Sequence, residues 1–231
     1  MSTTIKIEDD FAYNNNVASA SIYIRLGFLR KVYGILSAQV VMTTLVSAIF
    51  VLNETVRNFI QPNQWLLLLN IPFVIGTVIA LASYRKQVPH NFIFLGLFTL
   101  FESLSLGMLV SFFDKLVVLE ALFLTSTVVV GLTLFTFQTK RDFSKMGAGL
   151  TICIWLLIVG GLFQIFFHSE TYEWVICVFG VLVFSLFIIY DTQLIMKNLS
   201  EEEYILASLN LYLDIINLFV YILRILNARK N

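Results

Sequence analysis

The sequence predicts an all-α integral membrane protein, a bundle of seven transmembrane helices, and its composition, segment lengths and charge placement support this fold class. Of the 231 residues, 58% are hydrophobic and only 13% are charged, which is far more apolar than an ordinary soluble domain. Positive and negative residues balance at 15 each, so we expect no nucleic-acid partner. The charged residues gather in short gaps between long apolar segments, as in membrane spans joined by loops.

Seven apolar segments, each close to the roughly 20 residues that a bilayer requires, divide the chain. The gaps between them are short, so neighbouring segments should run antiparallel in one bundle without a soluble domain. We therefore expect an N-terminal tail over 1–31, a transmembrane domain over 32–226 and a C-terminal tail over 227–231. The segments run over about 32–52, 65–84, 92–113, 116–137, 147–167, 174–196 and 204–226.

The positions of lysine and arginine predict the orientation in the membrane. With seven crossings, most basic residues before the last segment fall on one side, which should be cytosolic together with the N-terminus. Arg229 and Lys230 then fall in the lumen, against the charge rule. A last segment that dips into the membrane without crossing would remove this conflict, whereas its length favours a full crossing. Residues 22–31 fit a short interfacial helix or an ordinary basic flank equally well.

The last apolar segment carries Asp214 near its middle, where a carboxylate facing lipid would cost at least a few kcal/mol. Steps of three and four residues place Asn210 and Asn217 on the same helical face as Asp214, and Arg224 continues that face. We interpret this polar face as the lining of a polar interior and the asparagines as pore-lining candidates. The alternative is that the asparagines only hydrogen-bond to neighbouring helices.

Asp191 lies in the sixth segment among apolar neighbours that offer no countercharge, so burial favours its protonated form. A tight hairpin would leave Asp191 and Asp214 offset by roughly 8–10 Å along the helix axes, so contact requires another connection. If the two carboxyl groups meet, both cannot ionise cheaply, and the pair titrates as a unit. The pair is then a proton-dependent latch or a permanent staple between two helices. With both groups ionised, it is an anionic site suited to Ca²⁺.

Other acidic residues also fall in or beside the spans. Glu102, near the middle of the third segment, is a further pore-lining candidate whose partner the sequence does not identify. Glu120 lies close to the lumenal boundary, where solvation costs little. Glu202 and Glu203 belong to an acidic run at the cytosolic start of the last segment. They are solvated residues of a helix start, or they concentrate cations at an entrance.

Two stretches that contain these aspartates resemble a known family. FIIYDTQLIMK and LNLYLDIINLFVYILRIL are similar to the paired signature of the transmembrane Bax-inhibitor-motif family. Two further stretches, IEDDFAYNNNVASASIYIRLGFLRKVYGIL and FTFQTKRDFSKMGAGL, resemble its Golgi anti-apoptotic (Lifeguard) branch, which is known from vertebrates and poxviruses. The frequent Ile, Asn and Phe favour a viral member. The resemblance covers nearly the whole chain after about residue 7.

This resemblance implies a seven-helix bundle of the Bax-inhibitor type, in which Asp191 and Asp214 form a pH sensor between the last two helices. It also implies that Arg85, at the end of the second span, engages one aspartate in the closed state and acts as a latch. The alternative for Arg85 is an ordinary positive flank. The family is associated with a Ca²⁺ leak from internal stores and with suppression of apoptosis.

We therefore predict a pH-sensitive Ca²⁺ leak channel of Golgi and ER membranes that lowers store Ca²⁺ and inhibits apoptosis. We expect no cofactor, with Ca²⁺ and H⁺ as permeant or regulatory ions and Asp191 and Asp214 as the Ca²⁺ ligands. The expected partners are membrane lipids, further copies of the chain, or other membrane proteins of apoptosis and Ca²⁺ release. The alternatives are a Ca²⁺/H⁺ antiporter and a non-conducting scaffold that binds apoptosis regulators. We do not expect an enzyme, because no substrate or water-access motif accompanies the aspartates.

Overall fold

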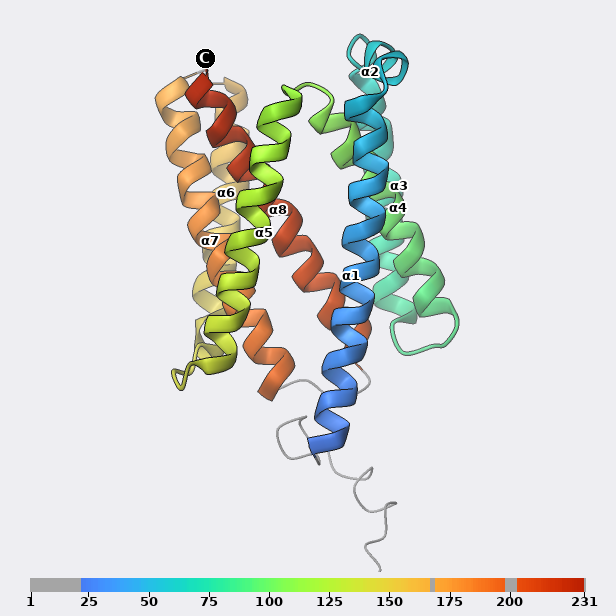
Figure 1. The fold of residues 1–231 in the computed structure, drawn as a ribbon, viewed down its shortest axis with the longest axis vertical. Helices are drawn as coiled ribbons and strands as arrows, with labels where there is room; N and C mark the ends of the chain where they lie inside the picture. Colours follow the sequence, from blue (N-terminus) through green and yellow to red (C-terminus); the bar gives the residue numbers. More distant parts are fainter. Residues whose placement is uncertain (1–21, 167–168, 198–202, 231) are drawn as a thin grey trace, which may run out of the picture.

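The computed structural model describes residues 22–166, 169–197 and 203–230. The described residues form helices and no strands, and seven helices are long and apolar enough to cross a membrane, which confirms the predicted fold class. The long helices stand side by side, and one of them crosses the bundle obliquely (Figure 1). The spans are α1 (Ile22–Leu52), α3 (Trp65–Tyr84), α4 (His90–Val110), α5 (Lys115–Gln138), α6 (Gly147–Phe166), α7 (Glu170–Lys197) and α8 (Tyr204–Lys230).

The helices match the predicted segments and differ from them at their ends. α1 begins at Ile22, so residues 22–31 continue the first span as one helix instead of forming a separate interfacial helix. α4 ends at Val110 because the next residues turn toward Asp114, whose side chain caps α5 by accepting a hydrogen bond from the Leu116 amide at 2.8 Å. α8 continues to Lys230, through most of the predicted C-terminal tail.

A short helix, α2 (Glu54–Ile60), follows α1 and was not predicted. Asn53 caps its start, because the side-chain oxygen accepts hydrogen bonds from two backbone amides of the first turn at 3.0 and 3.3 Å. Arg57 and Gln61 then donate to backbone carbonyls of the connection between α4 and α5, at 3.1 and 3.0 Å. α2 therefore ties the end of α1 to the start of α5.

α8 is the central element of the bundle. About 61% of its apolar window is buried, against 11–44% in the other spans. It packs on α7, α5 and α1, and it begins near the lower ends of α1 and α4 and ends beside α6 and α7 at the other side (Figure 1). α8 thus runs obliquely through the bundle and is long and apolar enough to cross a membrane; whether it crosses fully stays a prediction.

Buried hydrogen bonds hold the first half of α8 against α1 and α4. The Tyr212 hydroxyl lies 2.8 Å from the Thr43 hydroxyl of α1, which lies 2.9 Å from the Ser103 hydroxyl of α4. At the start of α8, the Asn91 amide of α4 donates to the Tyr204 hydroxyl at 3.3 Å. Polar contacts of this kind join helices inside a membrane, where no water competes for them. These hydrogen bonds hold the first half of α8 against α1 and α4, on the side of the bundle away from the end of α7.

Candidate functional site

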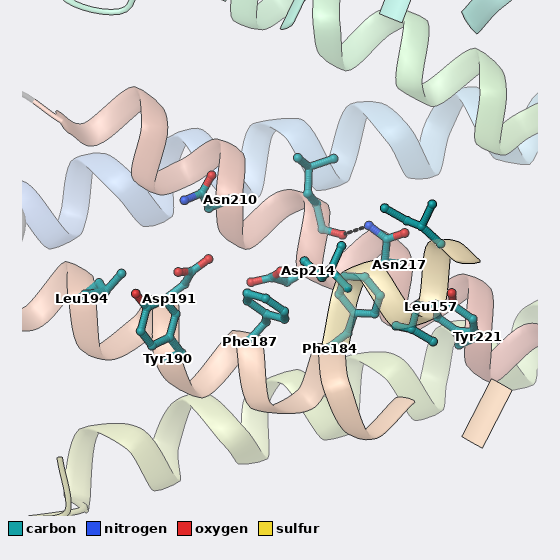
Figure 2. A pocket seen from close by; sticks show the side chains of 13 residues that line it. Leu157, Phe184, Phe187, Tyr190, Asp191, Leu194, Asn210, Asp214, Asn217 and Tyr221 are labelled. Atoms are coloured by element: carbon teal, nitrogen blue, oxygen red, sulfur yellow. Dashed lines mark hydrogen bonds between the residues drawn. The ribbon is translucent and has the colours of Figure 1, made fainter. Parts of the chain in front are cut away.

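A cavity of about 580 Å³ lies between α6, α7 and α8 and contains both predicted aspartates. Asp191 and Asp214 are each only 6% exposed. The remaining lining is mostly apolar and aromatic (Figure 2). We call this space the aspartate cavity; besides the two aspartates, its lining consists of Ile154, Leu157, Ile158, Phe184, Phe187, Tyr190, Leu194, Asn210, Leu213, Asn217 and Tyr221.

The two carboxyl groups lie in the same cavity between α7 and α8. Figure 2 shows both of them in the space between these helices, and burial close together couples their protonation. Oδ2 of Asp214 is buried and finds no hydrogen-bond partner in the part of the chain that the structure describes. Two carboxyl groups in contact are stable together only when a proton reduces their repulsion. The arrangement is therefore chemically that of a coupled pair; its role as a pH sensor stays a prediction.

The oblique course of α8 explains how the aspartates meet despite the offset expected for a tight hairpin. α8 does not start beside the end of α7, because Tyr204 is held by Asn91 of α4 and lies under Lys31 of α1, whose Nζ is 3.3 Å from the ring centroid. From there α8 crosses the bundle toward α6 and α7 (Figure 1), and its Asp214 lines the same cavity as Asp191 of α7. The helix spacing alone could not indicate this crossing.

The polar face of α8 points into the same cavity. Asn210, Asp214, Asn217 and Tyr221 all line it, as the spacing of three and four residues predicts. Asn217 also donates to the backbone carbonyl four residues earlier at 2.8 Å, so its side-chain oxygen is left for the cavity. The cavity thus presents two carboxyl groups and two carboxamides on an otherwise apolar wall. A pore-lining role of the asparagines stays a prediction.

Two glycines admit the tyrosine rings that border the cavity. A Cβ atom on Gly180 of α7 would lie 2.6 Å from the Tyr221 ring, which also stacks on Phe184 with ring centroids 5.8 Å apart. A Cβ atom on Gly147, at the start of α6, would lie 2.5 Å from the Tyr190 hydroxyl. Any larger residue at either position would have to displace its tyrosine.

One turn beyond Tyr221, Arg224 continues the polar face of α8 and forms an ion pair with Glu173. Nη2 of Arg224 lies 3.0 Å from the Glu173 carboxylate of α7 and donates to the Gln164 side-chain oxygen of α6 at 2.9 Å. Both charged side chains are partly exposed, at 28% and 39%. The spacing places Arg224 on the polar face, but its partners could not be predicted, because they lie on two other spans.

The other predicted site residues lie outside the aspartate cavity. Arg85 is exposed just after α3 and forms no ion pair with Asp191 or Asp214, so this conformation does not contain the latch, which stays a prediction. Glu102 is half-buried on α4 and does not line the cavity. Glu203 is half-buried at the start of α8 and does not line the cavity. Glu202 falls outside the described residues.

Sequence reasoning missed the part played by Gln193, two residues after Asp191. Its side-chain oxygen accepts from the Phe143 amide at 2.7 Å, and its nitrogen donates to the Arg141 carbonyl at 2.6 Å. Gln193 therefore fastens the connection between α5 and α6 to the turn of α7 that carries the aspartate. The signal was present in the stretch YDTQ, but a single glutamine in a span does not reveal its backbone partners.

Ca²⁺ binding by Asp191 and Asp214 stays a prediction. Ca²⁺ takes six to eight oxygen ligands in proteins, and the two carboxyl groups and two carboxamides of the cavity offer at most six oxygen atoms. Within the described ranges, no group of three or more His, Cys, Asp and Glu residues is arranged to hold a metal ion.

The chain has relatives of known name. It matches the family described as "Inhibitor of apoptosis-promoting Bax1" over residues 25–231. It is 50% identical over 228 residues to the Golgi anti-apoptotic protein of Vaccinia virus (strain Lister), a match covering 99% of this chain and 96% of the relative. It is 47% identical over 222 residues to protein lifeguard 4 of Mus musculus, covering 96% and 93%. It is 42% identical over 224 residues to Bax inhibitor 1 of Schizosaccharomyces pombe, covering 96% and 84%.

Proposed function

The chain belongs to the family of inhibitors of apoptosis-promoting Bax1, and from this premise we propose that it is a pH-sensitive Ca²⁺ leak channel of Golgi and ER membranes that inhibits apoptosis. The printed names of two relatives, Golgi anti-apoptotic protein and Bax inhibitor 1, support inhibition of apoptosis, and the first supports the Golgi membrane. Lower store Ca²⁺ would leave less Ca²⁺ for apoptotic release. No catalytic step is required.

The single observation that carries this proposal is that Asp191 and Asp214 lie together, both almost fully buried, in one cavity between membrane-spanning helices. A proton shared by the two carboxyl groups stabilises the contact between α7 and α8. When the proton leaves, the two carboxylates repel each other; for any two unit charges at about 4 Å and an effective dielectric constant of 20, the repulsion is about 4 kcal/mol. That repulsion opposes the packing of α7 on α8, so opening is favoured as the pH rises.

The course of the ion follows from the polar face of α8. Asn210, Asp214 and Asn217 offer oxygen atoms at successive turns, which suits a cation moving along the helix. At the far end, Tyr221 and the Arg224–Glu173 pair obstruct the way and must move for conduction. The lysine and arginine distribution supports a cytosolic N-terminus, and Ca²⁺ would then move from the store to the cytosol.

Ca²⁺ flux from vesicles that contain the purified full-length protein tests the proposal. We expect wild-type flux to be several-fold higher at about pH 8 than at about pH 6, because deprotonation opens the aspartate pair. Asp191→Asn and Asp214→Asn should give low flux at both pH values, since an amide does not ionise. Glu120→Gln is the matched control: Glu120 is an exposed carboxylate of α5 outside the cavity, and its removal should leave the pH response intact.

An unchanged pH response in both asparagine variants would refute the role of the aspartate pair. Proton counterflow in a fixed ratio to Ca²⁺ would identify an antiporter instead of a channel. A complete lack of flux, with protection from apoptosis surviving neutralisation of both aspartates, would identify a non-conducting scaffold.

A further inference from the structure

A second cavity, of about 550 Å³, lies on the opposite side of α8 from the aspartates. Its walls are α1 and α5, and its floor is formed by Ile215, Ile216 and Phe219 of α8. We call it the α1–α5 groove; in Figure 1, α8 passes behind the space between these two helices. The three floor residues lie between about 100° and 200° around the helix from Asp214. α8 itself therefore separates the groove from the aspartate cavity.

The lining of the groove suits a hydrocarbon. Most of its residues are Val, Leu and Ile. The hydroxyl groups of Thr44, Thr125 and Ser126 each donate to the backbone carbonyl four residues earlier, at 2.7–2.8 Å, so they offer a ligand no free donor. An apolar cavity of this kind stays dry and takes apolar guests. Most of the wall therefore favours a hydrocarbon guest.

The groove opens sideways toward the surroundings of the bundle. Val41, Leu119 and Val130 line it and are 57%, 68% and 58% exposed. In a membrane, side chains with this exposure on a spanning helix face lipid, so the groove communicates with the acyl chains of the bilayer. Lipid is therefore present at the opening at the highest concentration of any apolar molecule.

One end of the groove carries a positive charge. Lys115, the first residue of α5, lines this end together with Leu52, the last residue of α1. Arg57 of α2 donates to the connection just before α5, which adds a second cation nearby, and Asp114, which caps α5, adds a carboxylate beside them. Basic residues at the ends of spans attract the phosphate groups of lipids. The Lys115 ammonium therefore offers a partner for the phosphate of a phospholipid.

Ser47 supplies a second polar feature at the right depth. It lines the groove about 7 Å from the end of α1, at 1.5 Å per residue. Its hydroxyl oxygen is buried and has no hydrogen-bond partner in the described part of the chain. In a phospholipid the ester carbonyls follow the phosphate toward the bilayer interior. An ester carbonyl at this depth would accept the hydrogen bond that Ser47 lacks.

We propose that the α1–α5 groove binds one membrane phospholipid, with its phosphate at Lys115, its ester region at Ser47 and one acyl chain along the floor formed by α8. The lining extends from Leu36 to Leu52 on α1 and from Lys115 to Val130 on α5, about 22–24 Å at 1.5 Å per residue. One leaflet contributes about 15 Å of hydrocarbon, so a whole acyl chain fits. This site does not depend on the Ca²⁺ flux proposed above.

Photolabelling of the full-length protein in phosphatidylcholine vesicles tests this site. The probes are phosphatidylserine and phosphatidylcholine that carry a diazirine on one acyl chain, and labelled peptides are identified by mass spectrometry. We expect labels to concentrate on the groove-facing residues of α1 and α5. Ser126→Phe fills the groove and should lower this labelling several-fold. The matched control is Thr127→Phe on the next, equally exposed residue, which does not line the groove and should change nothing.

The head-group assignment has its own test. Lys115→Gln should remove the preference for phosphatidylserine over phosphatidylcholine, by about fivefold, since one lysine near the surface contributes about that factor. Lys140→Gln, an exposed lysine outside the groove, should preserve the preference. Labels spread evenly over all lipid-facing helices, or unaffected by Ser126→Phe, would overturn the site. Crosslinks at the groove to a second copy of the chain in place of lipid would also overturn it.

Discussion

The two cavities on either side of α8 have similar volumes, about 580 and 550 Å³, but opposite chemistry. The aspartate cavity contains two carboxyl groups and two carboxamides, whereas the α1–α5 groove is lined mainly by hydrocarbon. A single helix separates them, because Asp214 and the neighbouring Ile215 and Ile216 project to different sides. The comparison shows that α8 acts as a partition, with one face lining each cavity.

The largest expected effect is a loss of stability when a carboxylate is placed on the groove-facing side of α8. Ile216→Asp would bury a charge against α1 and α5, where no cation faces it, and should cost about 3 kcal/mol of stability. Asp214→Asn keeps the size of the side chain and removes a carboxyl group that has no cationic partner, so it should change stability by less than about 1 kcal/mol. Thermal unfolding of both variants measures the difference.

Ile216→Val is the control for Ile216→Asp, because it removes one methyl group and typically costs about 0.5–1.5 kcal/mol. If Ile216→Asp were as stable as Asp214→Asn, the two faces of α8 would be interchangeable, and the partition would have no energetic basis.

The sequence was sufficient to predict the polar residues of the aspartate cavity. Asn210, Asp214 and Asn217 stand out in an apolar segment, and polar residues at helical spacing in a span have few explanations other than a polar interior. The family signature then linked Asp214 with Asp191. The seven spans were predictable for the same reason, since length and hydropathy decide them.

The groove and the crossing of α8 could not be predicted. Ile216 and Phe219 are ordinary residues of a membrane span, and nothing distinguishes a side chain that borders a void from one that faces a neighbouring helix. The crossing depends on contacts such as Tyr212 with Thr43, which lie 169 residues apart in sequence. Arg85 is a separate case: the family resemblance implies a latch there, the structure shows the residue exposed and without an ion pair to either aspartate, and the latch stays a prediction.

An intermediate effect is expected at the tyrosine end of the aspartate cavity. Gly180→Ala places a methyl group against the Tyr221 ring, and overpacking of this kind costs about 1–3 kcal/mol. Gly131→Ala on α5 is the matched control, because no atom lies within 4 Å of the added Cβ. If Gly180→Ala alters the Ca²⁺ flux but leaves lipid labelling of the groove unchanged, the two cavities respond independently. Equal stability of the two alanine variants would contradict the close packing of Tyr221.

The smallest expected effect concerns the Arg224–Glu173 pair. The two side chains are 28% and 39% exposed, so solvent screens their attraction and a coupling of no more than about 1 kcal/mol is expected. A double-mutant cycle with Arg224→Gln, Glu173→Gln and the combined variant measures it through unfolding. If the pair obstructs the proposed ion path, each single variant should also raise Ca²⁺ flux modestly, and because neither residue lines the groove, lipid labelling there should stay the same. A coupling near zero together with unchanged flux would mean that Tyr221 alone closes this end. If removing the ion pair changed lipid labelling of the groove, the two faces of α8 would be coupled.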